Sequence, residues 1–504
     1  MKGAMKILFA TSEAQPLVKT GGLADVSGSL PVALQQLGHD VRIVLPAYRC
    51  VLEQVPDARA VSELSLPSGD APVRVLRSDL PGSAVPLYLI DSPLHFDRPG
   101  NPYTGPDGSD WPDNGRRFAT FARAVQALAQ GRADGDWSPE IVHCNDWQTG
   151  LVPALLALED QRPATLFTIH NLAYQGLFSW DEFQRLSLPY ELWSMHAMEF
   201  HGQLSFIKGG LAFADRLTTV SPTYAREICT PQFGAGLHAL LNHRRSHLHG
   251  ILNGVDYSVW NPSTDPYIPQ HYSNRSLGHK TRNRKPLLER FGMIRQDDAP
   301  VIGMVGRLVH QKGVDLVLAV LQRLLAQPVQ MVVLGSGQAE YEQALLEAAE
   351  RHDNLGVKIG YDEELAHLLE AGSDLFLMPS RFEPCGLNQL YSLRFGTVPV
   401  VRRTGGLADT VVDADLATLR DGSATGFVFD GETPDAFYGA VQRALCLYTA
   451  RPAWRQLMHA GMRQDFSWER SARGYVELYR EALSAPYTPP APPSPATGPS
   501  APGG

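Results

Sequence analysis

Short runs of apolar residues alternate along the chain with segments in which apolar residues recur at helical spacing. The runs are rich in Ile, Val, Leu and Phe, and polar or glycine residues follow most of them at once. Short apolar runs bounded in this way are typical of buried β-strands. Strands are predicted at residues 6–10, 41–46, 141–144, 165–170, 301–305, 330–334, 375–379 and 398–401.

The segments between these runs indicate how the strands are connected. Residues 26–37 have the periodicity of an amphipathic helix and end at Gly38, a residue type that commonly terminates helices. Strands that alternate with helices form parallel sheets joined by crossover helices, so the pattern predicts the α/β class. In such sheets the loops at the carboxyl ends of the strands form the binding crevice, and candidate functional residues are sought there.

A glycine-rich segment lies between the first predicted strand and the first predicted helix. It contains Lys19, Thr20, Gly21 and Gly22. Glycines let the backbone approach a ligand closely, a helix N-terminus favours an anion, and Lys19 adds a point charge. The alternative for Lys19 is a solvated surface lysine.

The same segment contains an internal repeat, because Thr20–Asp25 recurs identically as Thr404–Asp409. One interpretation is two similar α/β domains that each offer a glycine-rich turn to one ligand. The other is two copies of a common loop-to-helix turn. The sequence leaves both open.

Two cations follow the strand predicted at 301–305. Arg307 lies just beyond the strand, and Lys312 follows five residues later. An arginine fork and a compact lysine charge in one crevice loop suit a diphosphate. The alternative is a solvated loop.

The strand predicted at 375–379 leads into a segment with several candidate groups. Glu383 suits sugar hydroxyls, and the amides of Gly386 and Leu387 suit a phosphate at the start of a helix. The alternative for Glu383 is a carboxylate that stabilises the helix start. Cys385 has no evident partner base, so a small contact residue is favoured over a nucleophile.

Two further candidates end predicted strands in the first half of the chain. His170 ends the strand predicted at 165–170 and suits acid–base chemistry or a hydrogen bond to a sugar hydroxyl, whereas a lone histidine is more often structural. Asp146 follows the strand at 141–144 and carries the same ambiguity.

Composition and charge narrow the classes of protein that fit this pattern. A chain of 504 residues suits two large domains or three small ones, and 44% hydrophobic residues exclude a mainly disordered chain. The net charge of −9 argues against non-specific nucleic-acid binding. No apolar run is long enough to span a membrane. Five scattered cysteines and the lack of a signal-peptide pattern predict a cytoplasmic location.

Several segments depart from the strand–helix pattern. Residues 77–115 are rich in Gly, Pro, Asp and Asn and predict a long surface excursion, and the basic stretch 279–285 predicts a solvated face. A turn-rich stretch predicts a domain boundary near 250–265, and the Pro-rich tail 486–504 predicts disorder.

No metal site is predicted. His243, His247 and His249 lie among arginines, and no cysteine or carboxylate stands at a suitable ligand spacing.

Taken in order, these segments resemble those of bacterial glycogen synthases and the related starch synthases. Each motif alone is weak, but the ordered set is specific and extends from about residue 5 to residue 482. The motifs are Lys19-Thr-Gly-Gly-Leu-Ala-Asp25, His143-Cys-Asn-Asp-Trp147, Thr168-Ile-His-Asn-Leu-Ala-Tyr-Gln-Gly176, Val220-Ser-Pro-Thr-Tyr-Ala-Arg-Glu227, Asn253-Gly-Val-Asp256, Gly306-Arg-Leu308, Gln311-Lys-Gly313, Ser380-Arg-Phe-Glu-Pro-Cys-Gly-Leu387 and Arg403-Thr-Gly-Gly-Leu-Ala-Asp409.

The resemblance implies a GT-B architecture, in which two Rossmann-like domains with parallel sheets face a central cleft. The implied divisions are an N-terminal, acceptor-side domain at 1–250, a nucleotide-sugar-binding domain at 251–466, a helix at 467–485 that crosses back to the first domain, and the tail at 486–504. The implied activity is retaining transfer of glucose from ADP-glucose to the non-reducing end of an α-1,4-glucan. Neither nucleic acid nor membrane is an expected partner, and no oligomeric state is predicted.

The resemblance also assigns residues. It places Lys19, Gly21 and Gly22 at the nucleotide-sugar donor, Arg307 and Lys312 at the diphosphate, His170, Glu383 and Cys385 around the transferred glucose, Gly386 and Leu387 at the phosphate-facing helix start, Tyr361 on the nucleobase, and Asp146 at the cleft. It implies no metal and no cofactor, because cations and helix-end amides meet the charge of the leaving diphosphate. Front-face attack by the acceptor hydroxyl is the implied route to retention.

Two other hypotheses compete with the synthase. A non-catalytic glucan- or nucleotide-binding protein could share the fold, since a fold does not fix a function. A related enzyme could use UDP-glucose or form another linkage. A phosphorylase would need a lysine for pyridoxal phosphate, and no motif indicates one.

Overall fold

The structure is a computed structural model that describes residues 3–67, 72–132, 135, 137–296 and 298–487. The chain divides into two compact units. The first unit comprises Met1–Thr219, Ala225–Ile251 and Ser471–Gly504, and the second comprises Val220–Tyr224 and Leu252–Arg470.

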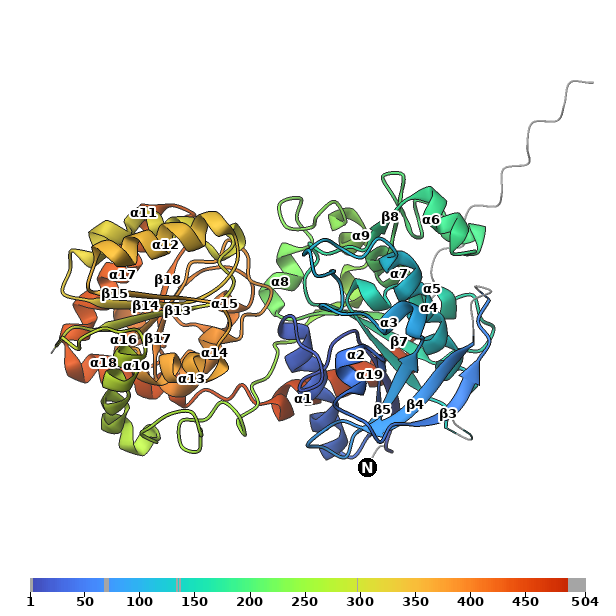
Figure 1. Cartoon of the computed structure of the whole chain (residues 1–504), viewed down its shortest axis with the longest axis horizontal. Coiled ribbons are helices and arrows are strands. Elements are labelled where there is room, and N and C mark those ends of the chain that lie inside the picture. Colours follow the sequence, from blue (N-terminus) through green and yellow to red (C-terminus); the bar gives the residue numbers. More distant parts are fainter. Residues whose placement is uncertain (1–2, 68–71, 133–134, 136, 297, 488–504) are drawn as a thin grey trace, which may run out of the picture. The chain divides into compact units, whose positions relative to one another are not determined.

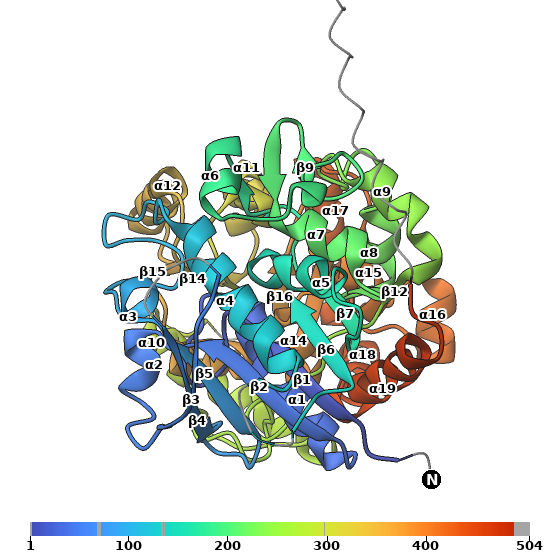
Figure 2. The ribbon, with the colours of Figure 1, turned by 90° about the vertical axis from the view of Figure 1, so that its right-hand side faces the viewer.

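A nine-stranded sheet forms the centre of the first unit, with the strand order β12-β11-β7-β6-β1-β2-β5-β4-β3. All neighbouring strands are parallel except β5–β4 and β4–β3, which are antiparallel. Figure 2 shows the strands from β5 through β2, β1 and β6 to β7 in one layer. The strands are β1 (Lys6–Ala10), β2 (Asp40–Pro46), β3 (Arg59–Leu64), β4 (Val73–Asp79), β5 (Pro86–Asp91), β6 (Ile141–Asn145), β7 (Ala164–Ile169), β11 (Arg216–Thr219) and β12 (Leu248–Gly250).

The central strands of this sheet are apolar because helices or loops cover them on both faces. In β1 every residue after Lys6 is buried, and Ile7 pairs with Val41 of β2 and with Ile141 of β6. Near-continuous apolar runs are what a two-sided parallel sheet requires. Separately, three short strands form an antiparallel sheet in the order β8-β10-β9: β8 (Leu177–Phe178), β9 (Glu199–Phe200) and β10 (Gln203–Ser205).

The helices of the first unit include a segment from the far end of the sequence. Residues of α19 from Ser471 onward belong to this unit. There His143 of β6 contacts Tyr479 through a 2.8 Å hydrogen bond at Nδ1 and packs its ring on Tyr475. The helices are α1 (Gly22–Gln36), α2 (Arg49–Leu52), α3 (Pro93–Phe96), α4 (Asn114–Ala129), η1 (Trp147–Thr149), α5 (Leu151–Leu156), α6 (Trp180–Arg185), η2 (Tyr190–Leu192), α7 (Phe206–Phe213), α9 (His238–His243), η3 (Arg245–His247) and α19 (Trp468–Ser484). Helix α8 (Pro222–Glu227) is divided, because its residues up to Tyr224 belong to the second unit and those from Ala225 to the first.

The second unit is built on a six-stranded, fully parallel sheet with the order β15-β14-β13-β16-β17-β18. Its elements are η4 (Asn274–Asn283), α10 (Arg284–Arg290), β13 (Val301–Val305), η5 (His310–Lys312), α11 (Val314–Leu325), β14 (Gln330–Gly335), α12 (Ala339–Arg351), β15 (Leu355–Ile359), α13 (Glu363–Gly372), β16 (Leu375–Met378), α14 (Asn388–Phe395), β17 (Val398–Arg402), α15 (Gly405–Thr410), α16 (Leu416–Asp421), β18 (Phe427–Phe429), α17 (Pro434–Thr449) and α18 (Arg451–Met462).

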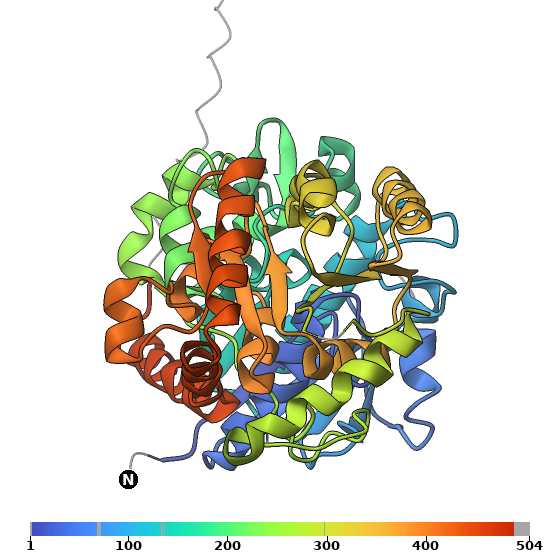
Figure 3. The same ribbon diagram turned by 90° about the vertical axis from the view of Figure 1, so that its left-hand side faces the viewer.

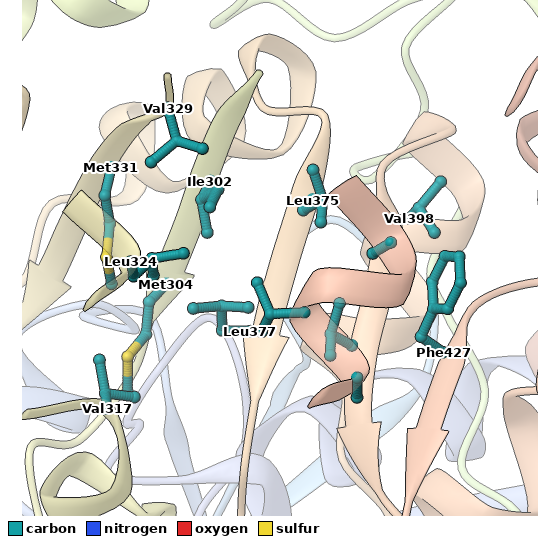
Figure 4. Packing of buried hydrophobic residues seen from close by; sticks show 14 of the residues in the cluster. Ile302, Met304, Val317, Leu324, Val329, Met331, Leu375, Leu377, Val398 and Phe427 are labelled. Carbon is teal, nitrogen blue, oxygen red and sulfur yellow. The ribbon is translucent and has the colours of Figure 1, made fainter. Parts of the chain in front are cut away.

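Helices cover both faces of this second sheet, with α11 and α12 on one side and α10 and α13 on the other (Figure 1 and Figure 3). Successive strand residues point to opposite faces, so each strand serves two cores. Ile302 and Met304 belong to the core under α11, whereas Val301 belongs to the core under α13. Figure 4 shows the first of these cores, where Val317 and Leu324 of α11 approach the strands.

These observations confirm the predicted α/β class, and the eight predicted strands are present with ends shifted by at most a few residues. The predicted helix at 26–37 begins earlier, at Gly22, and ends at Gln36. The glycine-rich turn itself therefore forms the start of the helix.

The prediction that residues 77–115 are a surface excursion is wrong for part of that range. Residues Pro86–Asp91 form β5, a buried strand inside the sheet that pairs in parallel with β2. Leu87 through Ile90 are fully buried. The Gly and Pro residues on either side obscured a short apolar run that is a strand in its own right.

The prediction that the basic stretch 279–285 is a solvated face is also wrong at two positions. The ammonium group of Lys280 is buried and donates to Thr397 Oγ1 (2.7 Å) and to the carbonyl of Glu370 (2.8 Å). Arg284 is buried and forms an ion pair with Asp374. Each cation has partners far away in the sequence, which permits burial.

The predicted disordered tail at 486–504 lies outside the described residues except for Pro486 and Tyr487. Among the described residues, no helix combines the length and the apolar character needed to cross a membrane.

Candidate functional site

The glycine-rich loop of the first unit follows β1 and leads into α1. Lys19, Thr20 and Gly21 are exposed, and Gly21 is the N-cap of α1 with an extended backbone (φ −158°). The Lys19 ammonium lies 2.8 Å from Asp25 Oδ1 in the first turn of the helix. The loop therefore presents a cation and a helix N-terminus on the same exposed turn, as an anionic ligand requires.

A buried carboxylate that the sequence analysis missed supports this loop. Glu13 is 3% exposed, and its side chain accepts hydrogen bonds from Thr20 and Gly21 of the loop. It also accepts one from the Tyr103 hydroxyl, 90 residues away along the chain. A lone glutamate after a strand carries no sequence signal for these partners.

The other two candidates of the first unit lie against each other. Asp146 and His170 follow the adjacent strands β6 and β7, and Asp146 Oδ1 accepts from the His170 backbone N–H at 2.7 Å. The backbone of Asp146 has a positive φ of 55°, which is unusual for a residue other than glycine. A residue held in such a conformation by its surroundings is often part of a functional site.

The protonation of His170 follows from its neighbours. Burial lowers the pKa of its imidazole to about 3, so the ring is neutral at physiological pH. The Asn145 amide donates through Nδ2 to the carbonyl of Ala10 at 3.0 Å, which directs Oδ1 toward His170 Nε2 at 3.0 Å. His170 Nε2 therefore carries the proton, and Nδ1 is left as an acceptor.

Burial also raises the pKa of the Asp146 carboxyl to about 7, although the N–H groups of His170 and Asn171 favour its charged form. Glu13 adds to this increase through like-charge repulsion. Asp146 thus changes its protonation state near neutral pH, as groups that transfer protons commonly do.

In the second unit, the two predicted cations lie on one loop after β13. Arg307 is exposed, with its guanidinium 3.4 Å from Gln311 Oε1, and Lys312 ends the short helix η5. Gly313 comes next in the left-handed conformation (φ 70°), and a Cβ there would lie 2.2 Å from the carbonyl oxygen of Pro379. Only glycine lets the loop pass so close to the segment that carries Glu383.

Lys312 and Glu383 form an ion pair within the second unit. Lys312 Nζ lies 2.5 Å from Glu383 Oε2, which also accepts from Ser380 Oγ at 3.1 Å. Glu383 is 6% exposed, so these partners take the place of water around its carboxylate. The structure thus brings together a cation predicted for phosphate and a carboxylate predicted for sugar.

The second copy of the repeat, Thr404–Asp409, packs against the backbone of the segment that carries Glu383. A Cβ on Gly405 would lie 1.9 Å from the carbonyl oxygen of Glu383, and one on Gly406 would lie 2.0 Å from that of Cys385. The Gly406 N–H donates to the carbonyls of Glu383 (3.1 Å) and Pro384 (3.2 Å). This copy is a backbone support for the Glu383 segment.

The remaining candidates of the second unit differ in exposure. Burial raises the pKa of the Cys385 thiol to about 12, which leaves it protonated and unreactive. Gly386 adopts a positive φ of 73° just before α14, and no hydrogen bond among the described residues uses the amides of Gly386 and Leu387. Tyr361 is 77% exposed after β15, with its hydroxyl on Glu363.

A cavity of about 450 Å³ in the first unit has none of the predicted site residues in its lining: Pro112, Asp113, Arg116, Thr120, Arg123, Glu182, Arg185 and Leu186. Within the described part of the chain, no group of three or more His, Cys, Asp and Glu side chains could hold a metal ion.

Comparison with known proteins assigns the two halves of the chain to related families. Residues 6–243 match the family described as starch synthase catalytic domain, and residues 288–456 match glycosyl transferases group 1. Over 95% of its length the chain is 57% identical to glycogen synthase 1 of Methylococcus capsulatus, of which it covers 97%. The chain belongs to the glycogen synthase family.

Other members and one solved structure agree with this assignment. The glycogen synthase of Thioalkalivibrio sulfidiphilus is 57% identical over 95% of this chain and 100% of its own length. The catalytic domain of starch synthase IV from Arabidopsis thaliana, solved with ADP and acarbose, matches with a TM-score of 0.85 at 34% identity, over 96% of this chain and 100% of the other. The resemblance found in the sequence is confirmed, and this member of the glycogen synthase family is a GT-B glycosyltransferase.

The fold alone is shared more widely. Sucrose-phosphate synthase from Thermosynechococcus elongatus matches with a TM-score of 0.59 at 19% identity, over 95% of this chain and 99% of the other. At that identity the similarity extends to the fold, and the glycogen synthase assignment rests on the nearer relatives.

Proposed function

We propose that this member of the glycogen synthase family transfers glucose from ADP-glucose to the non-reducing end of an α-1,4-glucan with retention of the anomeric configuration. The observation that carries the proposal is the near full-length identity to curated glycogen synthases. The solved starch synthase that contains ADP and acarbose, an adenine nucleotide and an oligosaccharide analogue, supports the donor and acceptor classes.

The second unit supplies the groups for the donor diphosphate. Arg307 offers a guanidinium fork, and Lys312 has three N–H donors, of which one reaches Glu383. The amides of Gly386 and Leu387 add donors at the start of α14. Negative charge grows on the leaving phosphate as the glucosyl bond breaks, so donors fixed in advance lower the barrier. Tyr361, exposed after β15, packs on the nucleobase.

Glu383 and His170 are the residues assigned to the transferred glucose. Glu383 holds glucose hydroxyls and steadies the positive character that develops at the ring. His170 is neutral with its proton on Nε2, so its Nδ1 accepts a hydrogen bond from a glucose hydroxyl and donates none. Lys19, with Gly21 and Gly22, binds the donor through its charge and the N-terminus of α1. Asp146 holds the backbone of His170.

Retention follows from attack on the face that the diphosphate leaves. The acceptor hydroxyl forms the new bond to the anomeric carbon as the bond to the phosphate oxygen breaks. The departing phosphate oxygen takes the proton of that hydroxyl. No protein nucleophile is required, in keeping with the protonated state of Cys385.

The decisive experiment measures ADP release when glycogen is added to the purified chain with ADP-glucose, with UDP-glucose as the competing donor. We expect release that depends on glycogen, that prefers ADP-glucose, and that EDTA leaves unchanged, because cations of the protein meet the phosphate charge. Tight glucan binding without release would favour the non-catalytic hypothesis. Loss in EDTA with recovery in Mg²⁺ would contradict the metal-free mechanism. The free state of all five cysteines suits the cytoplasm as the site of this activity.

A further inference from the structure

We propose that Glu13 is a positioning residue that fixes the loop Lys19–Gly22 to Tyr103 and so holds the loop in the geometry in which it binds the donor. The inference deepens the proposed function, because it rests on the assignment of that loop to the donor. Glu13 does not touch the ligand itself, since its carboxylate is fully occupied by protein groups.

Four donors converge on the Glu13 carboxylate, and three of them come from the loop. Oε2 accepts from the backbone N–H groups of Thr20 (2.6 Å) and Gly21 (3.2 Å). Oε1 accepts from the hydroxyls of Thr20 (2.6 Å) and Tyr103 (2.6 Å). A carboxylate is the one side-chain group that accepts at all of these positions at once.

Because Glu13 is buried and charged, its carboxylate needs all of these hydrogen bonds. The residue is 3% exposed, and no ion pair among the described residues includes it. A buried carboxylate without a cation is strongly unfavourable unless hydrogen bonds satisfy it. The loop donors therefore cannot move away without leaving a buried charge unsatisfied.

Tyr103 gives the loop a connection to a distant segment. Its backbone carbonyl accepts from Asn114 Nδ2 at 3.0 Å and from the Trp111 N–H at 3.0 Å. Burial and the charge of Glu13 raise the pKa of its phenol well above the ordinary value, so the hydroxyl stays protonated and donates. Glu13, which follows β1, thus joins the loop to the segment before α4.

The other copy of the same sequence has different surroundings. At Thr404–Gly406 the turn is buried, and backbone carbonyls of Glu383 and Pro384 hold it. The first copy is exposed and lacks that packing. Its rigidity comes from Glu13, and rigidity in an exposed glycine turn matters for a ligand more than for the core.

The principal test compares Glu13→Gln with Asp215→Asn. Asp215 is a matched control because it is fully buried in the same unit and also accepts from a threonine N–H and hydroxyl, those of Thr165. Glu13→Gln places an NH2 against N–H donors. We expect it to raise KM for ADP-glucose about tenfold or more, with a smaller change in kcat. Asp215→Asn lowers the melting temperature and leaves that KM within about twofold. Equal KM in Glu13→Gln and the wild type would overturn the proposal.

A milder pair of variants tests the connection itself. Tyr103→Phe and Thr20→Val each remove one hydroxyl donor to Glu13 and retain shape. Each alone should raise KM for ADP-glucose about three- to tenfold, and neither should add to the effect in the Glu13→Gln background. Fully additive effects would show that the residues act independently, against the proposal.

Amide hydrogen exchange separates this inference from the proposed function. In Glu13→Gln the amides of Thr20 and Gly21 should exchange at least about tenfold faster, and ADP should bind correspondingly more weakly, whereas Asp215→Asn changes neither. If the wild-type chain releases no ADP from ADP-glucose, the proposed function fails, and these two measurements still decide the role of Glu13. Unchanged exchange and unchanged ADP affinity would overturn that role even in an active enzyme.

Discussion

The two copies of the sequence Thr-Gly-Gly-Leu-Ala-Asp are identical in six residues and opposite in surroundings. The first copy, Thr20–Asp25, begins α1 with an exposed turn, and a Cβ on Gly21 would meet no atom within 4 Å. The second copy, Thr404–Asp409, begins α15 with a buried turn, and a Cβ on Gly405 would lie 1.9 Å from the carbonyl oxygen of Glu383.

The aspartates that close the two copies differ in the same way. Asp25 pairs with Lys19, the residue just before its own copy, at 2.8 Å. Asp409 accepts from the N–H and the hydroxyl of Thr223, both at 2.7 Å, in a segment 186 residues away. One copy is thus arranged around its own exposed turn and the other ties together distant parts of the second unit. The repeated sequence forms the same turn and helix start in both copies, and the surroundings decide whether the turn is exposed or packed against a neighbouring segment.

Alanine at the glycines gives the largest expected contrast. Gly405→Ala combines a positive φ of 43° with a clash against a backbone carbonyl, and we expect a loss of more than about 4 kcal/mol of stability or no folded protein. Gly21→Ala has an extended φ and open space, so it should cost less than about 1 kcal/mol. Thermal and urea unfolding of both variants measure this. Similar losses in the two would remove the distinction between the copies.

The segment that the second copy supports should control the chemical step. Arg307→Ala and Lys312→Ala remove the donors that we propose for the leaving phosphate, and each should lower kcat about 10²- to 10³-fold, or ~2.7–4 kcal/mol, with donor binding less affected. Glu383→Gln keeps the shape, loses the charge that pairs with Lys312, and should also lower kcat. Steady-state kinetics together with melting temperatures check this. Near-native kcat in all three variants would defeat the site assignment.

Much of this architecture could be predicted because the signal is local. The central strands are buried on both faces, so β1, β13 and β14 stand out as apolar runs. Strand β5 is equally buried, but the glycines and prolines on either side give its segment the composition of a surface loop. Binding residues lie at the carboxyl ends of parallel strands, so position alone makes Arg307 and His170 candidates, whatever their contacts are.

Partnerships between distant residues could not be predicted in the same way. Lys312 and Glu383 are 71 residues apart, and Glu13 and Tyr103 are 90 residues apart. Neither pair has a spacing that any one element imposes. The burial of Lys280 escaped prediction for the same reason, since its partner Thr397 lies 117 residues away. Which charges are buried depends on the packing of whole elements, which one sequence does not reveal.

The basic residue that precedes each copy offers a smaller, matched contrast. Lys19 stands before the exposed copy and is proposed to bind the donor, whereas Arg403 stands before the buried copy and pairs with the exposed Asp430 at 2.7 Å. Lys19→Ala should lower kcat/KM for ADP-glucose about 10- to 100-fold, the value of a hydrogen bond to a charged group. Arg403→Ala should leave it within about twofold, because exposed ion pairs contribute little. Equal effects would indicate that both copies face the donor.

The smallest expected effect comes from the titration of Asp146, which the charge of Glu13 influences. Burial, aided by the charge of Glu13, raises the pKa of Asp146 to about 7 in the folded chain, against an ordinary value near 4. Because the folded state then binds the extra proton, the stability from this group is complete below about pH 4 and is lost as the pH rises to about 7. Asp146→Asn cannot ionise and should lose less stability than the wild type between pH 5.5 and 8, by on the order of 1 kcal/mol.

Asp215 provides the control for this prediction. The Arg162 hydrogen bonds lower the pKa of Asp215 despite its burial, so this group contributes its stability above about pH 4. The stability of Asp215→Asn should therefore change with pH between 5.5 and 8 as that of the wild type does. Melting temperatures at the two pH values measure both. An identical pH dependence of stability in Asp146→Asn and the wild type would contradict the raised pKa of Asp146. A smaller change of stability with pH in Glu13→Gln than in the wild type would show that the charge of Glu13 contributes to that raised pKa.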